Sequence, residues 1–260
     1  MQPVLFSFLG IDVQAYGVSK ALAALVGAFV LGSMFERRGL PKESAHTLVL
    51  WATVWGFVGA KIYYLAEQLP NLTMHDLGGM GFTWFGGLIG GIAAALVVIR
   101  RHKLPLGTVA GLATVPLSLA YAIGRLGCLW AGDGTYGRPS DLPWAMSFPR
   151  GAVPTDVPVH PTPLYEAIAA MVIAVILWRL GRRIPLAVVF GAYLVLSGVS
   201  RFLVETLRIN EPVLGPLTQP QLWSVLSVVV GTVIMARAGA SARSTAVAAT
   251  VDEPAPAPVG

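Results

Sequence analysis

Apolar residues are gathered into seven runs along the chain, and polar residues are concentrated between these runs. A helix needs about 20 apolar residues to cross the hydrocarbon core of a bilayer, and most of the runs reach or approach this length. They lack the apolar–polar alternation of membrane-spanning strands. Because each span must satisfy its own backbone hydrogen bonds, the pattern predicts helices. The predicted spans cover residues 17–35, 45–68, 84–99, 106–129, 163–180, 186–208 and 219–237.

Basic residues predict how these spans are oriented, because they cluster after the first, third, fifth and seventh spans. Loops rich in Lys and Arg stay on the cytoplasmic side of a membrane. We therefore expect an all-α integral membrane protein with seven transmembrane helices, an N-terminus outside and a cytoplasmic C-terminus. The clusters are Arg37-Arg38 with Lys42, Arg100-Arg101 with Lys103, Arg179 with Arg182-Arg183, and Arg237 with Arg243.

A single membrane domain is expected over residues 1–240. Its longest outward segment, about 130–162, is rich in Gly, Pro, Asp and Trp. Such turn-forming residues indicate an ordered loop and not a separate folded domain. Residues 241–260 are rich in Ala and Pro, and we expect them to form a disordered cytoplasmic tail.

The composition agrees with a membrane location and argues against other classes. Of the 260 residues, 55% are hydrophobic and only 12% are charged, whereas soluble domains usually have about 25% charged residues. The net charge of +5 is spread over short clusters between the spans, so no nucleic-acid partner is expected. Cys128 is the single cysteine, which excludes an internal disulfide. The motifs HExxH, CxxC, GxSxG and the P-loop are missing, and we expect neither a metal nor a cofactor.

Four charged side chains lie near the outward ends of two spans, where ionised groups are expensive. Arg125 lies in the fourth span, and Arg201, Glu205 and Arg208 follow at spacings of four and three in the sixth. These spacings place the last three on one helix face. The simplest interpretation is that Glu205 pairs with one arginine and the other arginines reach the membrane interface. However, one carboxylate cannot neutralise three guanidiniums, so an anion from outside the chain is expected.

The expected anion is a phosphate. A guanidinium is always charged, and its planar fork matches the geometry of phosphate oxygens. Close to the outward surface of a membrane, the available phosphate belongs to a lipid headgroup. We therefore expect Arg125 and Arg201, which come from different spans, to converge on one headgroup.

Two further motifs have both a functional and a structural interpretation. Gly86 and Gly87, at the start of the third span, allow close approach of either a ligand or a neighbouring helix. The segment HPTPLYE places His160, Tyr165 and Glu166 at the start of the fifth span. These three residues either belong to the site or anchor the beginning of a helix at the interface.

Taken in order, these motifs resemble the prolipoprotein diacylglyceryl transferase family. Each motif alone is common, but the ordered set is specific, and the similarity extends over about residues 16–237. The expected count of seven spans and the outward N-terminus also agree with the family. The segments that carry the resemblance are YG at 16–17, GGLIG at 86–90, GRLG at 124–127, HPTPLYE at 160–166 and RFLVETLR at 201–208.

The resemblance implies a bacterial inner-membrane enzyme whose site faces the periplasmic leaflet. Family members transfer a diacylglyceryl group from phosphatidylglycerol to the lipobox cysteine thiol of a prolipoprotein, and glycerol phosphate leaves. The implied partners are these two substrates and the surrounding membrane lipids. The matching catalytic residues are Arg125, Arg201 and Glu205, since arginines would stabilise charge that develops on the phosphate. From the motifs and the resemblance together, we place in substrate binding Tyr16, Gly86, Gly87, Asp133, Gly137, His160, Tyr165, Glu166 and Arg208.

Several positions depart from the family pattern. Phe85 stands where the family has a histidine, a proposed base for the thiol, and Cys128 stands where it has an asparagine. Ser197 replaces a tyrosine, Lys61 an arginine and Asp133 a glutamate. The half of the site that would bind the phosphate therefore agrees with the family better than the half that would receive the acceptor.

Two functions stay open from the sequence. The first is the transferase, or a divergent paralogue with another acceptor, for which the candidate bases are Tyr16, His160, Asp133 and Glu205. The second is a non-enzymatic transporter or scaffold that binds a phospholipid or another anion at the same headgroup site. Replacement of the family histidine by Phe85 motivates this alternative.

Overall fold

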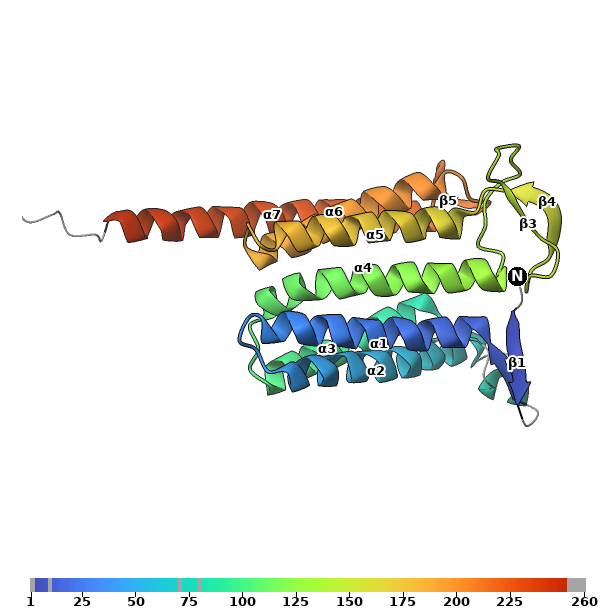
Figure 1. Cartoon of the computed structure of the whole chain (residues 1–260), viewed down its shortest axis with the longest axis horizontal. Helices are drawn as coiled ribbons and strands as arrows, with labels where there is room; N and C mark the ends of the chain where they lie inside the picture. Colours follow the sequence, from blue (N-terminus) through green and yellow to red (C-terminus); the bar gives the residue numbers. More distant parts are fainter. Residues whose placement is uncertain (1–2, 9–10, 70–71, 79–80, 252–260) are drawn as a thin grey trace, which may run out of the picture.

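The computed structural model describes residues 3–8, 11–69, 72–78 and 81–251, and most of these residues belong to long helices that lie side by side (Figure 1). Within the described residues, seven helices are long and apolar enough to cross a membrane, which confirms the predicted number of spans. The helices are α1 (Ala15–Glu36), α2 (Lys42–Gln68), α3 (Trp84–Arg101), α4 (Leu106–Ala131), α5 (Thr162–Leu180), α6 (Leu186–Glu205) and α7 (Gln219–Val251).

Two helix ends near the site have clear local causes. After α4, Gly132 has a φ of +60°, a conformation that glycine adopts without strain, and its N–H donates to the carbonyl of Cys128. The predicted sixth span is wrong at its outward end, because α6 stops at Glu205. The N–H groups of the next three residues, 206–208, bond to carbonyls three positions earlier, so the chain tightens into a turn before Arg208.

The fold is mostly helical, as expected, but it is not purely helical: within the described residues, three short antiparallel hairpins accompany the helices. All three lie at the same end of the bundle, which we call the hairpin end (Figure 1). Their strands have two to five residues, too few for an alternating pattern to distinguish them from loops. The strands are β1 (Val4–Phe8), β2 (Ile11–Gln14), β3 (Met146–Phe148), β4 (Thr155–Val159), β5 (Pro212–Leu214) and β6 (Leu217–Thr218).

The predicted disordered tail also differs from the structure. Helix α7 continues as far as Val251 and extends beyond the other helices at the end opposite the hairpins (Figure 1). Its apolar part, Gln219–Ala240, is long enough to cross the membrane by itself. The other residues of the predicted tail, 252–260, lie outside the described residues.

Two kinds of packing hold the bundle together. Helix α4 lies against α1 on one side and against α5 and α6 on the other, so it is the central helix of the site. Helices α2 and α3 approach so closely that a Cβ on Gly86 or on Gly59 would clash with the carbonyl of the other glycine. At the hairpin end the ring of Phe85 on α3 lies 5.5 Å from the ring of Trp223 on α7.

Candidate functional site

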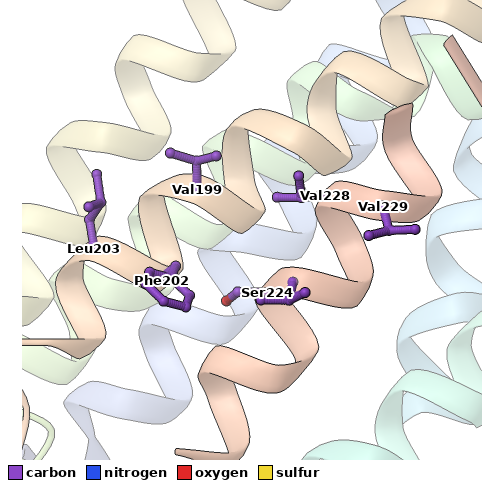
Figure 2. A pocket seen from close by; sticks show the side chains of 7 residues that line it. Val199, Phe202, Leu203, Ser224, Val228 and Val229 are labelled. Carbon is purple, nitrogen blue, oxygen red and sulfur yellow. The ribbon is translucent and has the colours of Figure 1, made fainter. Parts of the chain in front are cut away.

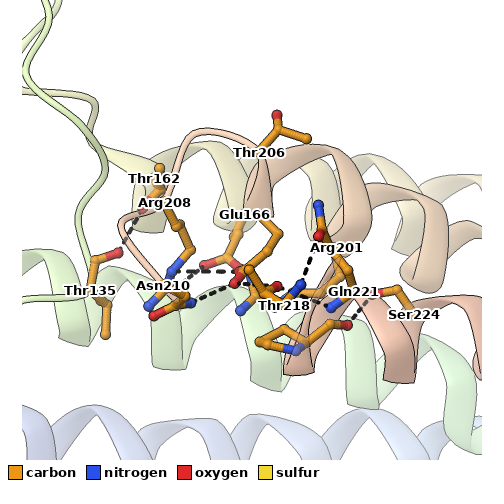
Figure 3. A network of polar contacts seen from close by, with 12 residues as sticks. Thr135, Thr162, Glu166, Arg201, Thr206, Arg208, Asn210, Thr218, Gln221 and Ser224 are labelled. Carbon is orange, nitrogen blue, oxygen red and sulfur yellow. Dashed lines mark hydrogen bonds and ion pairs between the residues drawn. The ribbon is translucent and has the colours of Figure 1, made fainter. Parts of the chain in front are cut away.

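Charged side chains from three helices converge near the hairpin end, and Glu166 of α5 lies at their centre. Its Oε2 is 2.7 Å from Nε of Arg125 on α4, and its Oε1 is 3.2 Å from Nη1 of Arg201 on α6. Arg208, in the turn after α6, approaches Oε2 of the same carboxylate to 3.9 Å. Figure 3 shows Glu166 between Arg201 and Arg208. Arg125 and Arg201 therefore converge on Glu166, and their convergence on a lipid headgroup stays a prediction.

Glu205 is the second carboxylate of this cluster. Its Oε2 lies 2.7 Å from Nη1 of Arg201 and 3.7 Å from Nε of Arg208. Its other oxygen, Oε1, accepts hydrogen bonds from Asn210 at 2.5 Å and from Thr218 at 3.0 Å. Glu205 thus joins the end of α6 to the β5–β6 hairpin and to the beginning of α7.

The charge of the cluster differs from the expectation drawn from α6 alone. The sequence spacing offered one carboxylate for three guanidiniums, whereas the structure brings Glu166 in from α5 as a second. Both carboxylates are almost fully buried, while the side chain of Arg201 is 23% exposed. Burial lowers the pKa of Arg208, and the positive charges of Arg201 and Arg125 lower it further. We call Arg125, Glu166, Arg201, Glu205 and Arg208 the charged cluster, and its net charge is about +1 with all five ionised.

Tyr121 also belongs to the site, although the sequence analysis did not single it out. Its hydroxyl accepts a hydrogen bond from Nε of Arg125 at 3.1 Å and donates one to Oε1 of Glu166 at 3.0 Å. It lies four residues before Arg125, so both side chains leave the same face of α4. That spacing was visible in the sequence, but Tyr121 lies in an apolar run and matches no motif that we used.

The long loop at 130–162 is hydrogen-bonded to the turn that carries Arg208. The N–H of Gly137 donates to the carbonyl of His160 at 2.8 Å, and the N–H of Arg138 donates to the carbonyl of Leu207 at 2.8 Å. A Cβ on Gly137 would lie 2.5 Å from the oxygen of Leu207. The structure therefore gives Gly137 a supporting position beside the charged cluster.

Other residues that we placed in substrate binding lie near the hairpin end but make their contacts elsewhere. Nδ1 of His160 lies 3.4 Å from the hydroxyl of Tyr165, which also accepts a hydrogen bond from Trp144 at 2.7 Å. Asp133 accepts hydrogen bonds from the N–H and the hydroxyl of Thr135 in the turn after α4. These contacts order the loop and the beginning of α5.

Gly86 and Gly87 lie at the α2–α3 contact, so the structure agrees with the helix-packing interpretation of this motif. A Cβ on Gly86 would clash with Gly59 and with the side chain of Tyr63, whereas one on Gly87 would lie 3.4 Å from the carbonyl of Gly56. These two glycines lie against α2, whereas the charged cluster is built from α4, α5 and α6.

Of the positions that depart from the family pattern, Phe85 and Ser197 have apolar or backbone contacts, whereas Cys128 lies near a charged side chain. Phe85 packs against Trp84 and Trp223. Ser197 donates its hydroxyl hydrogen bond to the carbonyl of Tyr193 within α6. Cys128 is buried, and its Sγ lies 4.0 Å from Nη1 of Arg125.

An apolar groove lies between α6 and α7 near the charged cluster (Figure 2). Its volume is about 240 Å³, and its wall on α6 includes Val199 and Leu203, which are each two residues from Arg201. Its wall on α7 includes Ser224, Val225, Val228 and Val229. The groove therefore runs along α6, the helix that carries Glu205, and along α7.

Seven apolar helices with buried, net-positive charge near one end define a multi-pass membrane protein with a candidate anion site. The chain belongs to the prolipoprotein diacylglyceryl transferase family, whose model matches residues 3–237. It is similar to proteins named phosphatidylglycerol–prolipoprotein diacylglyceryl transferase in several bacteria. These include relatives from Clostridium tetani (28% identity over 89% of this chain and 95% of the relative), Synechocystis sp. (30%, 88% and 87%) and Geobacter sulfurreducens (31%, 85% and 87%).

Proposed function

We propose that this chain transfers a diacylglyceryl group from phosphatidylglycerol to the cysteine thiol of a prolipoprotein lipobox. Membership of the transferase family and the names of its relatives support this reaction. The observation that carries the proposal is the charged cluster, in which three guanidiniums from two helices and a turn share two buried carboxylates. A phosphate anion would complete its charge balance.

The donor phosphate would bind to Arg125 and Arg201, and Arg208 would contribute its charge from the adjoining turn. Arg201 is the most exposed of the three side chains, at 23%, which suits it for contact with a ligand. Guanidinium groups bind phosphate oxygens through short, charge-assisted hydrogen bonds. Glu166 and Glu205 would orient the guanidiniums for this contact. Both carboxylates are almost fully buried.

The proposed reaction replaces a carbon–oxygen bond by a carbon–sulfur bond. The acceptor sulfur, as a thiolate, attacks the carbon of the diacylglycerol unit that is bonded to the phosphate oxygen. The bond between this carbon and the phosphate oxygen breaks, and its electron pair stays on that oxygen. Glycerol phosphate leaves with one more negative charge on its phosphate than the donor had. Fixed cations that face this oxygen would lower the barrier because they stabilise the charge as it develops.

The thiol proton must pass to a base or to water before or during the attack. Of the four candidates named from the sequence, Glu205 is the least suited, because it is fully buried and already has four partners. Tyr16, His160 and Asp133 belong to α1 or to the segments at the hairpin end. An acceptor thiol has a pKa near 8.5, so about a few per cent is already thiolate at neutral pH.

The groove between α6 and α7 supports a position for one acyl chain of the donor lipid. It is apolar and lies at the level of Arg201 along α6, on the face of this helix away from the arginine. The basic clusters follow α1, α3, α5 and the apolar part of α7, at the end opposite the hairpins. The positive-inside rule then favours a bacterial inner-membrane protein whose charged cluster faces the periplasmic leaflet, with the N-terminus outside.

Complementation tests the proposal against a non-enzymatic lipid-binding role. The full chain is expressed in a bacterium depleted of its own diacylglyceryl transferase, together with an Arg125→Ala variant as the control. We expect the wild-type chain to restore growth and thioether-linked lipoprotein, and the variant to insert in the membrane without restoring either. Failure of a well-expressed wild-type chain would favour the non-enzymatic role.

A further inference from the structure

Helix α1 carries a lysine, Lys20, at the depth of the charged cluster. Helices α1 and α4 pack side by side and run in opposite directions, and α1 begins at the hairpin end, where α4 finishes. Lys20 lies five residues after the beginning of α1, and Arg125 lies six residues before the end of α4. At about 1.5 Å per residue, both residues are roughly 8–9 Å inside their helix ends.

The contact between α1 and α4 places Lys20 against the residue next to Arg125. A Cβ on Gly124 would lie 3.6 Å from Nζ of Lys20, an ordinary contact distance, so the ammonium group lies directly against this glycine. One turn further toward the hairpin end, Gly127 packs directly against Ser19. Small residues of α4 thus allow α1 to bring its lysine close to the GRLG motif.

Lys20 has no counter-ion among the residues that the structure describes. In the part of the chain that the structure describes, none of the ion pairs includes this lysine. Its ammonium group lies 4.8 Å from the centre of the Tyr16 ring, a cation–π contact that leaves the charge uncompensated. Ionised residues within membrane spans are expensive and usually serve a function.

A structural explanation would be that Lys20 only extends toward the membrane interface. Tyr16 lies one turn nearer that interface on the same face, so this direction is available to the side chain. However, Lys20 is half-buried, and its nitrogen lies against Gly124, well inside the end of α4. This position keeps the ammonium group against the GRLG segment of α4, one residue from Arg125 in the sequence, on the side of α4 that faces α1.

We propose that Lys20 is a phosphate-binding residue for the departing glycerol phosphate. This inference rests on the proposed function. The charged cluster supplies a net charge of about +1, and Lys20 raises the total near the site to about +2. The donor phosphodiester carries one negative charge, whereas a free phosphate monoester carries about −1.5 to −2 at pH 7. Lys20 would therefore favour the product side of the reaction, at which the second negative charge appears.

The test compares Lys20→Met and Lys20→Arg with the wild-type chain. Lys42→Met is the matched control, because Lys42 is an exposed lysine at the opposite end of the bundle. Two quantities are measured on purified protein: kcat for transfer from phosphatidylglycerol to a lipobox peptide, and the Kd of glycerol phosphate by calorimetry. Thermal unfolding shows whether each variant keeps its fold.

We expect Lys20→Met to lower kcat and to weaken binding of glycerol phosphate by about tenfold or more, as loss of one charge-assisted contact implies. For Lys20→Arg and Lys42→Met, both kcat and the Kd of glycerol phosphate should stay within about threefold of the wild-type values, since both variants leave a cation at position 20. Binding of glycerol phosphate within twofold of wild type in a folded Lys20→Met variant would overturn the inference. If the wild-type chain transfers nothing but binds glycerol phosphate through Lys20, the proposed transfer reaction is wrong, whereas the assignment of Lys20 to phosphate binding is supported.

Discussion

Glu166 on α5 and Arg125 on α4 form an ion pair with 2.7 Å between Oε2 and Nε, and this pair connects the two helices at the depth of the site. Glu166 is also within ion-pair distance of Arg201 and Arg208. One buried carboxylate thus holds three guanidiniums in a fixed arrangement. Such an arrangement is prepared for an anion before the anion arrives, which reduces the reorganisation that accompanies reaction.

Removal of this carboxylate charge should be costly for both stability and activity. In Glu166→Gln, Arg125 would lose its carboxylate partner, while Arg201 and Arg208 would keep Glu205. Loss of one partner from a buried pair costs about 3–5 kcal/mol. We expect a lower thermal unfolding temperature and loss of transfer in detergent-solubilised protein. The matched control is Glu36→Gln, since Glu36 lies in an exposed 4.0 Å pair with Lys42 and should change neither quantity. An active and fully stable Glu166→Gln variant contradicts the assigned role.

Tyr121 should act by positioning Arg125 and Glu166. Tyr121→Phe removes only the hydroxyl that bridges these two charged groups. Because hydrogen bonds to charged groups contribute about 1.5–3 kcal/mol, kcat should fall by about 10- to 100-fold with little change in KM for the acceptor peptide. The comparison is Tyr63→Phe on α2, where the ring is exposed on the bundle surface. If the two variants have equal kcat and KM, Tyr121 does not position the charged groups.

The two glycines at the beginning of α3 should differ in their tolerance of a methyl group. Gly86→Ala forces a clash with the backbone of Gly59, whereas the new methyl group in Gly87→Ala meets its neighbours at 3.4 Å or more. Overpacking typically costs about 1–3 kcal/mol, so Gly86→Ala should unfold at a lower temperature than Gly87→Ala. KM for phosphatidylglycerol should not separate the two variants. A shared rise in KM without loss of stability would instead indicate that the glycines bind the lipid.

Gly137 offers a test of how the loop at 130–162 supports Arg208. In Gly137→Ala the methyl group would lie 2.5 Å from the carbonyl oxygen of Leu207, so the loop must move away from this turn. We expect transfer activity to fall by about tenfold or more as the turn shifts. The matched substitution Gly27→Ala on α1 meets no atom within 4 Å, and it should leave activity unchanged and stability equal or slightly higher. Normal activity in Gly137→Ala argues against support of Arg208 by the loop.

The seven spans could be predicted from the sequence because the length of an apolar run is nearly sufficient to define a membrane helix. Their ends were less certain. The stop of α6 at Glu205 depends on three successive tight-turn hydrogen bonds that no hydrophobic pattern reveals. The hairpins were missed for a related reason, since strands as short as β6 carry too few residues for a period of two to appear.

The site shows a similar division. Arg201 and Glu205 could be paired from their spacing on one helix, because such neighbours contact each other at every fourth position. The central position of Glu166 could not be predicted from the sequence, since it depends on how α5 packs against α4 and α6. Lys20 and Tyr121 were overlooked because each lies in an apolar run. Only the packing of α4 against α5 shows that Tyr121 contacts the charged cluster, and only the packing of α1 against α4 shows that Lys20 lies against Gly124.

The most direct measurement of the central claim is transfer by purified protein. Phosphatidylglycerol labelled in its acyl chains is incubated with a lipobox peptide and the wild-type chain, Arg125→Ala, Arg201→Ala, or Arg37→Ala at the opposite end of the bundle as the control. We predict that label becomes attached to the peptide thiol with the wild type and Arg37→Ala. With Arg125→Ala and Arg201→Ala, label should fall at least about 100-fold, since each loses a cation that stabilises the transition state. Near-normal labelling by folded Arg125→Ala or Arg201→Ala protein would contradict the account.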